Sequence, residues 1–127
     1  MAAGLVEMRP PIVLYDKGDV DLFLTTEDAE NAIEIIDVRN QEYVVYDSEG
    51  KLLRFRIIER PMVGGLLRRR DVVLEEAEET ASHRQELRNV VRQFLMHSGF
   101  SDESLPDELS QLIAELGRAL GKALNAT

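Results

Sequence analysis

The sequence predicts an α+β fold: a small antiparallel sheet of about four strands, one short helix inserted between the second and third strands, and two C-terminal helices. Short apolar or alternating stretches, separated by turn residues, occupy residues 12–60. Apolar residues at helical spacing dominate residues 73–127. Because 127 residues have room for one core, we expect a single domain with a sheet part (12–60), a connector (61–72) and a helical part (73–127).

The first hairpin and the inserted helix are expected within residues 12–36. The apolar run 12–15 and the alternating run 20–24 flank the turn Asp16-Lys17-Gly18-Asp19, where glycine can take a positive φ. Thr25 or Thr26 is a plausible N-cap for a helix running to about Ile35, with acidic residues in its first turn. The end of this helix stays open, because residues 35–38 could equally begin a strand.

The second hairpin has the clearest pattern. Residues 43–47 and 51–59 flank Asp47-Ser48-Glu49-Gly50, which has the composition of a type I turn closed by a glycine bulge. In the second of these strands, Leu53, Phe55 and Ile57 alternate with polar neighbours such as Arg54 and Arg56. This alternation predicts a sheet with one face open to water.

A connector containing Gly64-Gly65 and the cluster Arg68-Arg69-Arg70 is expected to precede a long helix that begins near Val73 and ends at His97-Ser98-Gly99-Phe100. The last helix is expected to start near Ser104, since residues 104–107 resemble a capping box and Pro106 suits a first turn. A line of small residues runs beside its apolar stripe: Ser110, Ala114, Gly117 and Gly121. Close approach of another helix would explain the two glycines, and fraying at a terminus would explain them equally well.

The composition excludes several classes of function. Without cysteine there is no disulfide, zinc–thiolate site or cysteine nucleophile. No apolar run approaches the roughly 18 to 20 residues that span a bilayer, and residues 1–10 lack the apolar region of a signal peptide. We therefore expect a cytoplasmic protein that binds no membrane.

Charge is unevenly distributed along the chain. Twelve acidic and three basic residues occupy positions 1–50, whereas positions 51–70 hold one acidic and seven basic residues. The net charge of -9 disfavours nucleic acid and favours a basic partner. The charge would also serve solubility alone.

No set of residues indicates catalysis or metal binding. His83 and His97 lie 14 positions apart, roughly 21 Å along one helix, so they cannot share a site. The cluster Asp16, Asp19 and Asp21 lacks the twelve-residue calcium-loop pattern and contains Lys17. We expect no enzyme, no cofactor and no metal site; an enzyme using carboxylates alone is the least favoured alternative.

A resemblance adds to this interpretation. The segments 13–19, 27–30, 36–38 and 42–47, within residues 12–58, resemble a family of small uncharacterised bacterial proteins that combine a hairpin, a short helix and a second hairpin. Several such families are immunity proteins that neutralise a toxin. The resemblance implies the fold of this part and a binding role.

The expected function is therefore a small acidic immunity or inhibitor protein that neutralises a basic toxin or effector by surface contact. The alternative is a self-assembling adaptor, a homodimer built on the helix–helix interface of Ser110, Ala114, Gly117 and Gly121. The partner-binding residues that we expect are acidic side chains on the open sheet face and the first helix: Asp19, Asp21, Glu27, Asp28, Glu30 and Glu42.

Overall fold

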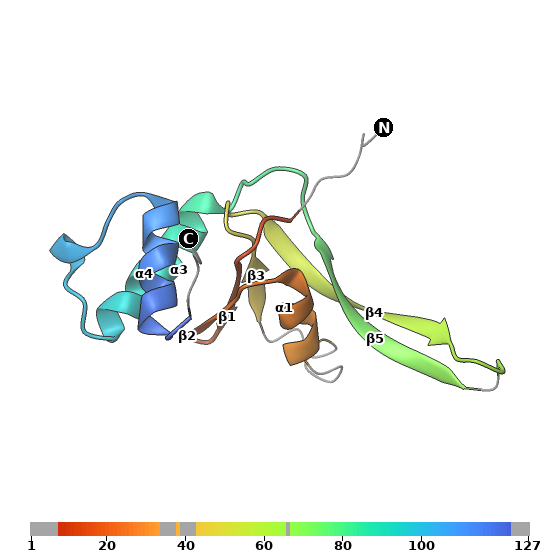
Figure 1. The fold of residues 1–127 in the computed structure, drawn as a ribbon. Coiled ribbons are helices and arrows are strands. Elements are labelled where there is room, and N and C mark those ends of the chain that lie inside the picture. The colour runs from red at the N-terminus through yellow and green to blue at the C-terminus, as the bar shows by residue number, and fades with distance from the viewer. Residues whose placement is uncertain (1–7, 34–37, 39–42, 66, 123–127) are drawn as a thin grey trace.

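A five-stranded antiparallel sheet with strand order β2-β1-β3-β4-β5 forms the centre of the computed structural model, which describes residues 8–33, 38, 43–65 and 67–122 (Figure 1). Its strands are β1 (Ile12–Asp16), β2 (Asp19–Phe23), β3 (Val44–Tyr46), β4 (Leu52–Pro61) and β5 (Arg68–Glu76). The helices of the described residues are α1 (Thr26–Ala32), α3 (Arg84–His97) and α4 (Leu109–Ala119), with a 3-10 turn η1 (Asp102–Ser104). The predicted α+β class is confirmed, with one strand more than expected.

One face of the sheet is covered by α3 and α4. Leucines on both helices, such as Leu87 and Leu112, are fully buried against Val13, Leu22 and Tyr46 of the strands. The large apolar area removed from water here makes this the main stabilising layer of the fold. In Figure 1 the two helices stand together beside β1 and β2.

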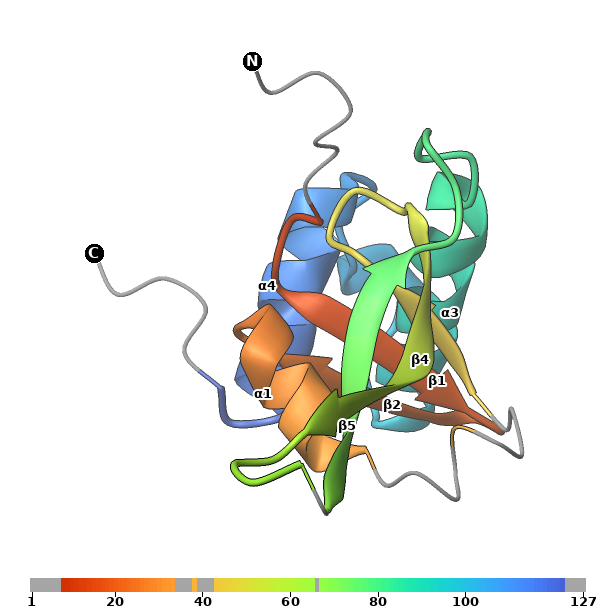
Figure 2. The same cartoon turned by 90° about the vertical axis from the view of Figure 1, so that its right-hand side faces the viewer.

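The opposite face of the sheet is partly covered by α1. Ala29 of α1 is fully buried in a second cluster with Ile12, Val45 and Phe55. The prediction of one water-exposed face is therefore wrong for the centre of the sheet, because alternate residues of β1 enter both clusters. In Figure 2 α1 lies in front of β1 and β2, and α4 lies behind them.

Both predicted hairpin turns are confirmed. Lys17 and Gly18 connect β1 to β2 with positive φ angles of 49° and 98°. Between β3 and β4, Gly50 closes the turn with φ 91°, and its N–H donates to the carbonyl of Asp47 at 3.2 Å. Thr25 is the N-cap of α1, where its Oγ1 accepts the N–H of Asp28 at 3.0 Å.

The segment expected to be a connector and the start of a long helix is instead β5. Val72, Val73 and Leu74 form an apolar run with two β-branched residues that pairs with β4, and Gly64 and Gly65 lie in the turn between the two strands. Favourable cross-strand pairs account for this outcome, since Glu75 lies opposite Arg54 and Arg70 lies opposite Glu59. Glu75, close to the expected helix start, forms ion pairs with Arg54 and Arg56 of β4.

The starts of the two C-terminal helices differ from the sequence interpretation, and the long helix begins at Arg84, not near Val73. The predicted stop of the long helix is confirmed, since α3 ends at His97 and the N–H of Phe100 donates to the carbonyl of Leu95 past Gly99. The predicted start of the last helix at Ser104 is wrong: Ser104 ends a 3-10 turn, and α4 begins at Leu109. The carbonyl of Pro106 accepts a hydrogen bond from Arg92 at 2.9 Å, which holds this loop on α3.

Candidate functional site

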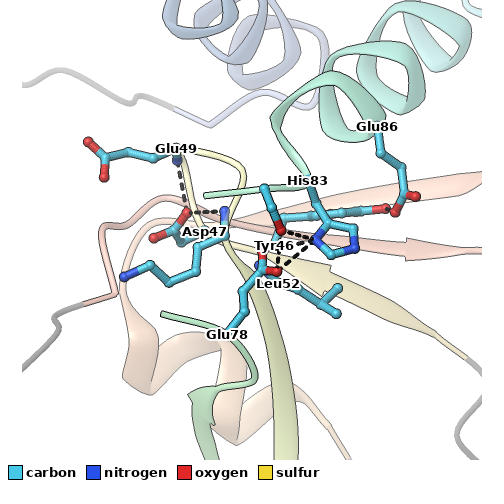
Figure 3. Close-up of polar contacts among 9 residues, drawn as sticks. Tyr46, Asp47, Glu49, Leu52, Glu78, His83 and Glu86 are labelled. Atoms are coloured by element: carbon cyan, nitrogen blue, oxygen red, sulfur yellow. Dashed lines mark hydrogen bonds and ion pairs between the residues drawn. The ribbon is translucent and has the colours of Figure 1, made fainter. Parts of the chain in front are cut away.

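A polar cluster joins the β3–β4 turn to the start of α3 (Figure 3). Asp47 is fully buried, and its carboxylate accepts the backbone N–H groups of Glu49 and Lys51 at 2.9 Å and that of Arg9 at 3.3 Å. Three backbone donors satisfy this buried charge. Two of these donors belong to the turn, and the third, Arg9, lies 38 positions away, so Asp47 has a structural role in holding the turn to the segment before β1.

Glu78, which follows β5, gathers three donors in the same cluster. Its carboxylate accepts the N–H of Leu52 at 2.7 Å, the Ser82 hydroxyl at 2.5 Å and Nδ1 of His83 at 2.9 Å. Desolvation raises the pKa of Glu78, but the hydrogen bonds from Ser82, Leu52 and His83 outweigh it and bring the pKa to about 2. Glu78 is thus an ionised anchor at neutral pH.

The serine, histidine and glutamate of this cluster lack the geometry of a catalytic relay. Ser82 Oγ lies 3.3 Å from Nδ1 of His83, the same ring nitrogen that contacts Glu78. A relay requires the acid and the nucleophile on different ring nitrogens. The hydroxyl of Tyr46 donates a hydrogen bond to Glu86 of α3. Burial raises the pKa of Tyr46 most, and this hydrogen bond raises it further. The cluster therefore fixes α3 on the sheet.

A second region has no such structural use. From Arg54 outward, β4 pairs only with β5, and the two strands continue as a ribbon that leaves the body of the molecule beyond α1 (Figure 1; in Figure 2 it points toward the viewer). We call residues 57–72 the arm. Those of its side chains that are described range from half-buried at its base to fully exposed at its end.

Arginine–carboxylate clusters lie along one face of the ribbon. At the base of the arm, Glu75 lies between Arg54 and Arg56, with N···O distances of 2.7 and 2.9 Å. The hydrogen bonds from these arginines, that of Arg54 first, lower the pKa of Glu75. Further out, Asp71 lies 3.0 Å from both Arg60 and Arg69. Each carboxylate is shared between two cations, so this face of the ribbon keeps an excess of positive charge.

The end of the arm is apolar and exposed. Val63 is 107% exposed, Leu67 is 67% exposed and Met62 is 46% exposed. They flank Gly64 and Gly65, both at positive φ, in the turn between β4 and β5. We call Met62, Val63 and Leu67 the tip. These side chains belong to neither core cluster, which makes the tip the strongest candidate for a contact surface in the part of the chain that is described.

The acidic residues expected to bind a partner occupy different environments. Asp19, Glu27 and Asp28 are exposed, whereas Asp21 lies 2.9 Å from Nζ of Lys122. Glu30 is half-buried and accepts the N–H of Leu74 at 2.6 Å, which is a structural role. Glu42 lies outside the described residues.

The small-residue line expected on the last helix is interrupted. Ser110 is exposed, Ala114 is half-buried and Gly117 is buried on α4. Gly121 lies past the end of α4 with φ 71°, and the N–H of Lys122 donates to the carbonyl of Gly117 at 2.7 Å. Gly121 thus ends the helix, which is a third explanation beside the two offered by the sequence.

Sequence reasoning missed the tip, although a signal was present. The apolar residues around Gly64-Gly65 were read as a connector, while the runs on either side form a hairpin. Among the described residues, no group of three or more histidine or acidic side chains is placed to hold a metal ion. In the same part of the chain, no helix has the length and apolar character needed to cross a bilayer.

No protein-family model matches the chain, and neither the curated proteins nor the solved structures include a significant match to it.

Proposed function

We propose that this protein is a binding protein of the inhibitor or immunity kind, which acts by surface contact and uses the arm as its main contact element. The observation that carries this proposal is the exposure of Met62, Val63 and Leu67 at the end of a ribbon that projects from the body. Large apolar side chains that meet on an exposed turn are typical of interaction sites. Such residues become the buried centre of an interface once a partner covers them.

The charge pattern supports a partner with a defined orientation. The body carries the acidic excess of the chain, including the exposed Asp19, Glu27 and Asp28, and the basic excess lies in the ribbon. A partner matches both surfaces if the part of it that faces the body is basic and the part that faces the arm is acidic. Such complementarity accelerates association and fixes the register of the complex.

Isothermal titration calorimetry against the protein encoded beside this chain tests the proposal. We expect binding that weakens with salt, because exposed charges are screened over about 8 Å at physiological ionic strength. Val63→Ser should weaken binding about tenfold or more, as loss of a central apolar anchor does. The matched control is Leu24→Ser, since Leu24 is 41% exposed but lies outside the arm.

Two results would count against this function. Absence of binding at low salt would remove the inhibitor role for that partner. Equal weakening by Val63→Ser and Leu24→Ser would remove the special role of the tip.

Self-assembly is the second candidate, and the same exposed tip favours it, because a second copy could cover it. Sedimentation velocity over a wide concentration range distinguishes the two functions. A monomer at every concentration eliminates self-assembly, whereas a dimer that Val63→Ser dissociates would place the tip in a homodimer.

A further inference from the structure

The two edge strands of the sheet, β2 and β5, differ in how their backbone groups are covered. At Leu22 in β2, the N–H donates to the side chain of Asp21 at 2.7 Å, and the carbonyl accepts Nζ of Lys122. At Leu74 in β5, the N–H donates to Glu30 of α1 at 2.6 Å. Side chains therefore cover both edges beside the body, as natural proteins do to prevent unwanted strand pairing.

No side chain of the described residues forms a hydrogen bond with the backbone of β5 farther out than Leu74. Antiparallel ladders alternate between pairs that exchange hydrogen bonds and pairs that do not. The N–H of Ala77, just after β5, donates to the carbonyl of Leu52, and the carbonyl of Leu67, just before β5, accepts the N–H of Met62. The odd-numbered residues of β5 therefore direct their backbone groups toward β4. Arg68, Arg70 and Val72 consequently turn their backbone N–H and carbonyl groups away from the sheet, as Leu74 does. Among the described residues, the N–H groups of Arg70 and Val72 have no acceptor.

A shallow, open groove of about 610 Å³ follows this edge. Three arginines of the arm line it, Arg60, Arg69 and Arg70, against two carboxylates. Glu30 is already bonded to the N–H of Leu74, and Asp71 is shared between Arg60 and Arg69. The Nε atoms of Arg60 and Arg70 contact Asp71 and Glu59, whereas their terminal Nη groups donate no hydrogen bond to another described residue. The groove thus combines free backbone groups with guanidinium donors that suit carboxylates.

We propose that the outer edge of β5, from Arg68 to Val72, binds an extended acidic segment of the partner protein as an added strand. Strand addition gives affinity through main-chain hydrogen bonds and specificity through alternate side chains. Acidic residues at alternate positions of the segment would lie on one face of the ribbon, beside Arg70. This inference rests on the proposed function, because it names the kind of partner segment that the arm binds.

Two other occupants fit the edge less well. A second copy of β5 centred on this open stretch would place Arg70 opposite Arg70 of the other copy, and like charges directly opposite are destabilising. Nucleic acid offers no strand of amide groups, and a chain with net charge -9 repels its phosphates.

Amide hydrogen exchange on the ¹⁵N-labelled full chain tests the inference. The probe is an acetylated and amidated peptide of four Glu-Val repeats, with four Lys-Val repeats as the charge control. A third peptide carries N-methyl groups on alternate residues of the Glu-Val sequence, so that it keeps the charge but loses the hydrogen-bond donors of one edge. We expect the Glu-Val peptide to slow exchange at Arg70 and Val72 by about tenfold or more, while the amide of Leu74, already bonded to Glu30, stays unchanged.

Variants separate this inference from the proposed function. Arg70→Glu should abolish the protection of both amides. Val72→Pro, which removes an outward N–H without removing a bond to β4, should abolish the protection of the remaining amide, that of Arg70. Val63→Ser at the tip should leave the protection unchanged. Loss of partner binding in Val63→Ser, combined with no effect of the Glu-Val peptide, would overturn the strand-addition inference and leave the proposed function in place.

Three further results would overturn the inference. Protection by the Lys-Val peptide equal to that by Glu-Val would remove the acidic specificity. Protection of Arg70 and Val72 that appears without peptide as protein concentration rises would assign the edge to a second copy. Salt-sensitive perturbation of these amides by a single-stranded oligothymidine, with none by Glu-Val, would assign the edge to nucleic acid.

Discussion

Gly50 is the position where the structure allows the sharpest stability prediction. It closes the β3–β4 turn with φ 91°, and its carbonyl accepts the N–H of His83 at 3.0 Å, just before α3 begins. A Cβ atom at this position would lie 2.3 Å from Cα and 2.7 Å from N of Arg84. Both are backbone atoms of the first residue of α3, so the overlap can be relieved only by moving the helix or the turn.

The expected cost of Gly50→Ala has two parts. The positive φ costs an L-residue about 1 to 2 kcal/mol, and overpacking against fixed backbone adds about 1 to 3 kcal/mol. Gly64→Ala is the matched control, because Gly64 has φ 94° but nothing within 4 Å of its Cβ position. The control retains the first part of the cost and lacks the second.

Urea unfolding followed by circular dichroism measures both variants. We expect Gly50→Ala to lose about 2 kcal/mol more than Gly64→Ala, a difference well above the extrapolation error of such measurements. Equal losses in the two variants would refute the close packing of the β3–β4 turn on α3.

Three further predictions concern the core, the polar cluster and the tip. Leu112→Ala should cost about 2 to 5 kcal/mol, because Leu112 is fully buried, whereas Leu67→Ala at the tip should change the free energy of unfolding by less than about 0.5 kcal/mol. Glu78 ionises with a pKa of about 2 in the folded chain against 4.5 ordinarily, so its contribution to the free energy of unfolding is complete above pH 4.5 and is lost as the pH falls toward 2. Glu78→Gln should therefore destabilise the protein at pH 7 and flatten the dependence of stability on pH between 2 and 4.5. An unchanged dependence would contradict the assignment. Tyr46→Phe should cost about 1 kcal/mol in the same unfolding assay, since the phenol donates to Glu86, and a stabilised variant would contradict that bond.

The sequence was most informative where local chemistry decides the structure. The hairpin turns at Gly18 and Gly50, the Thr25 cap and the stop at Gly99 depend on the conformational freedom of glycine or on a short side chain within a few residues. These features were predicted correctly. The class of the fold followed from them, because hairpins and amphipathic helices leave few ways to build one core.

Features that depend on distant pairing could not be predicted in the same way. Arg68-Arg69-Arg70 and the residues from Val73 onward read as a basic cluster followed by a helix start, and only pairing with β4 reveals residues 68–76 as one strand. Likewise, nothing local distinguishes Glu30, which caps Leu74 across 44 positions of sequence, from the exposed acids of the same helix. The tip could not be predicted, because the exposure of its side chains depends on how the whole ribbon projects from the body.

Site-specific photocrosslinking in the cell of origin tests most directly whether the arm is the surface by which this protein works. A p-benzoylphenylalanine side chain is placed at Val63, and at Glu103, an exposed position of η1, as the control. We expect position 63 to give one discrete crosslinked product that position 103 does not give. Absence of any product at position 63, or the same products at both positions, would contradict the account.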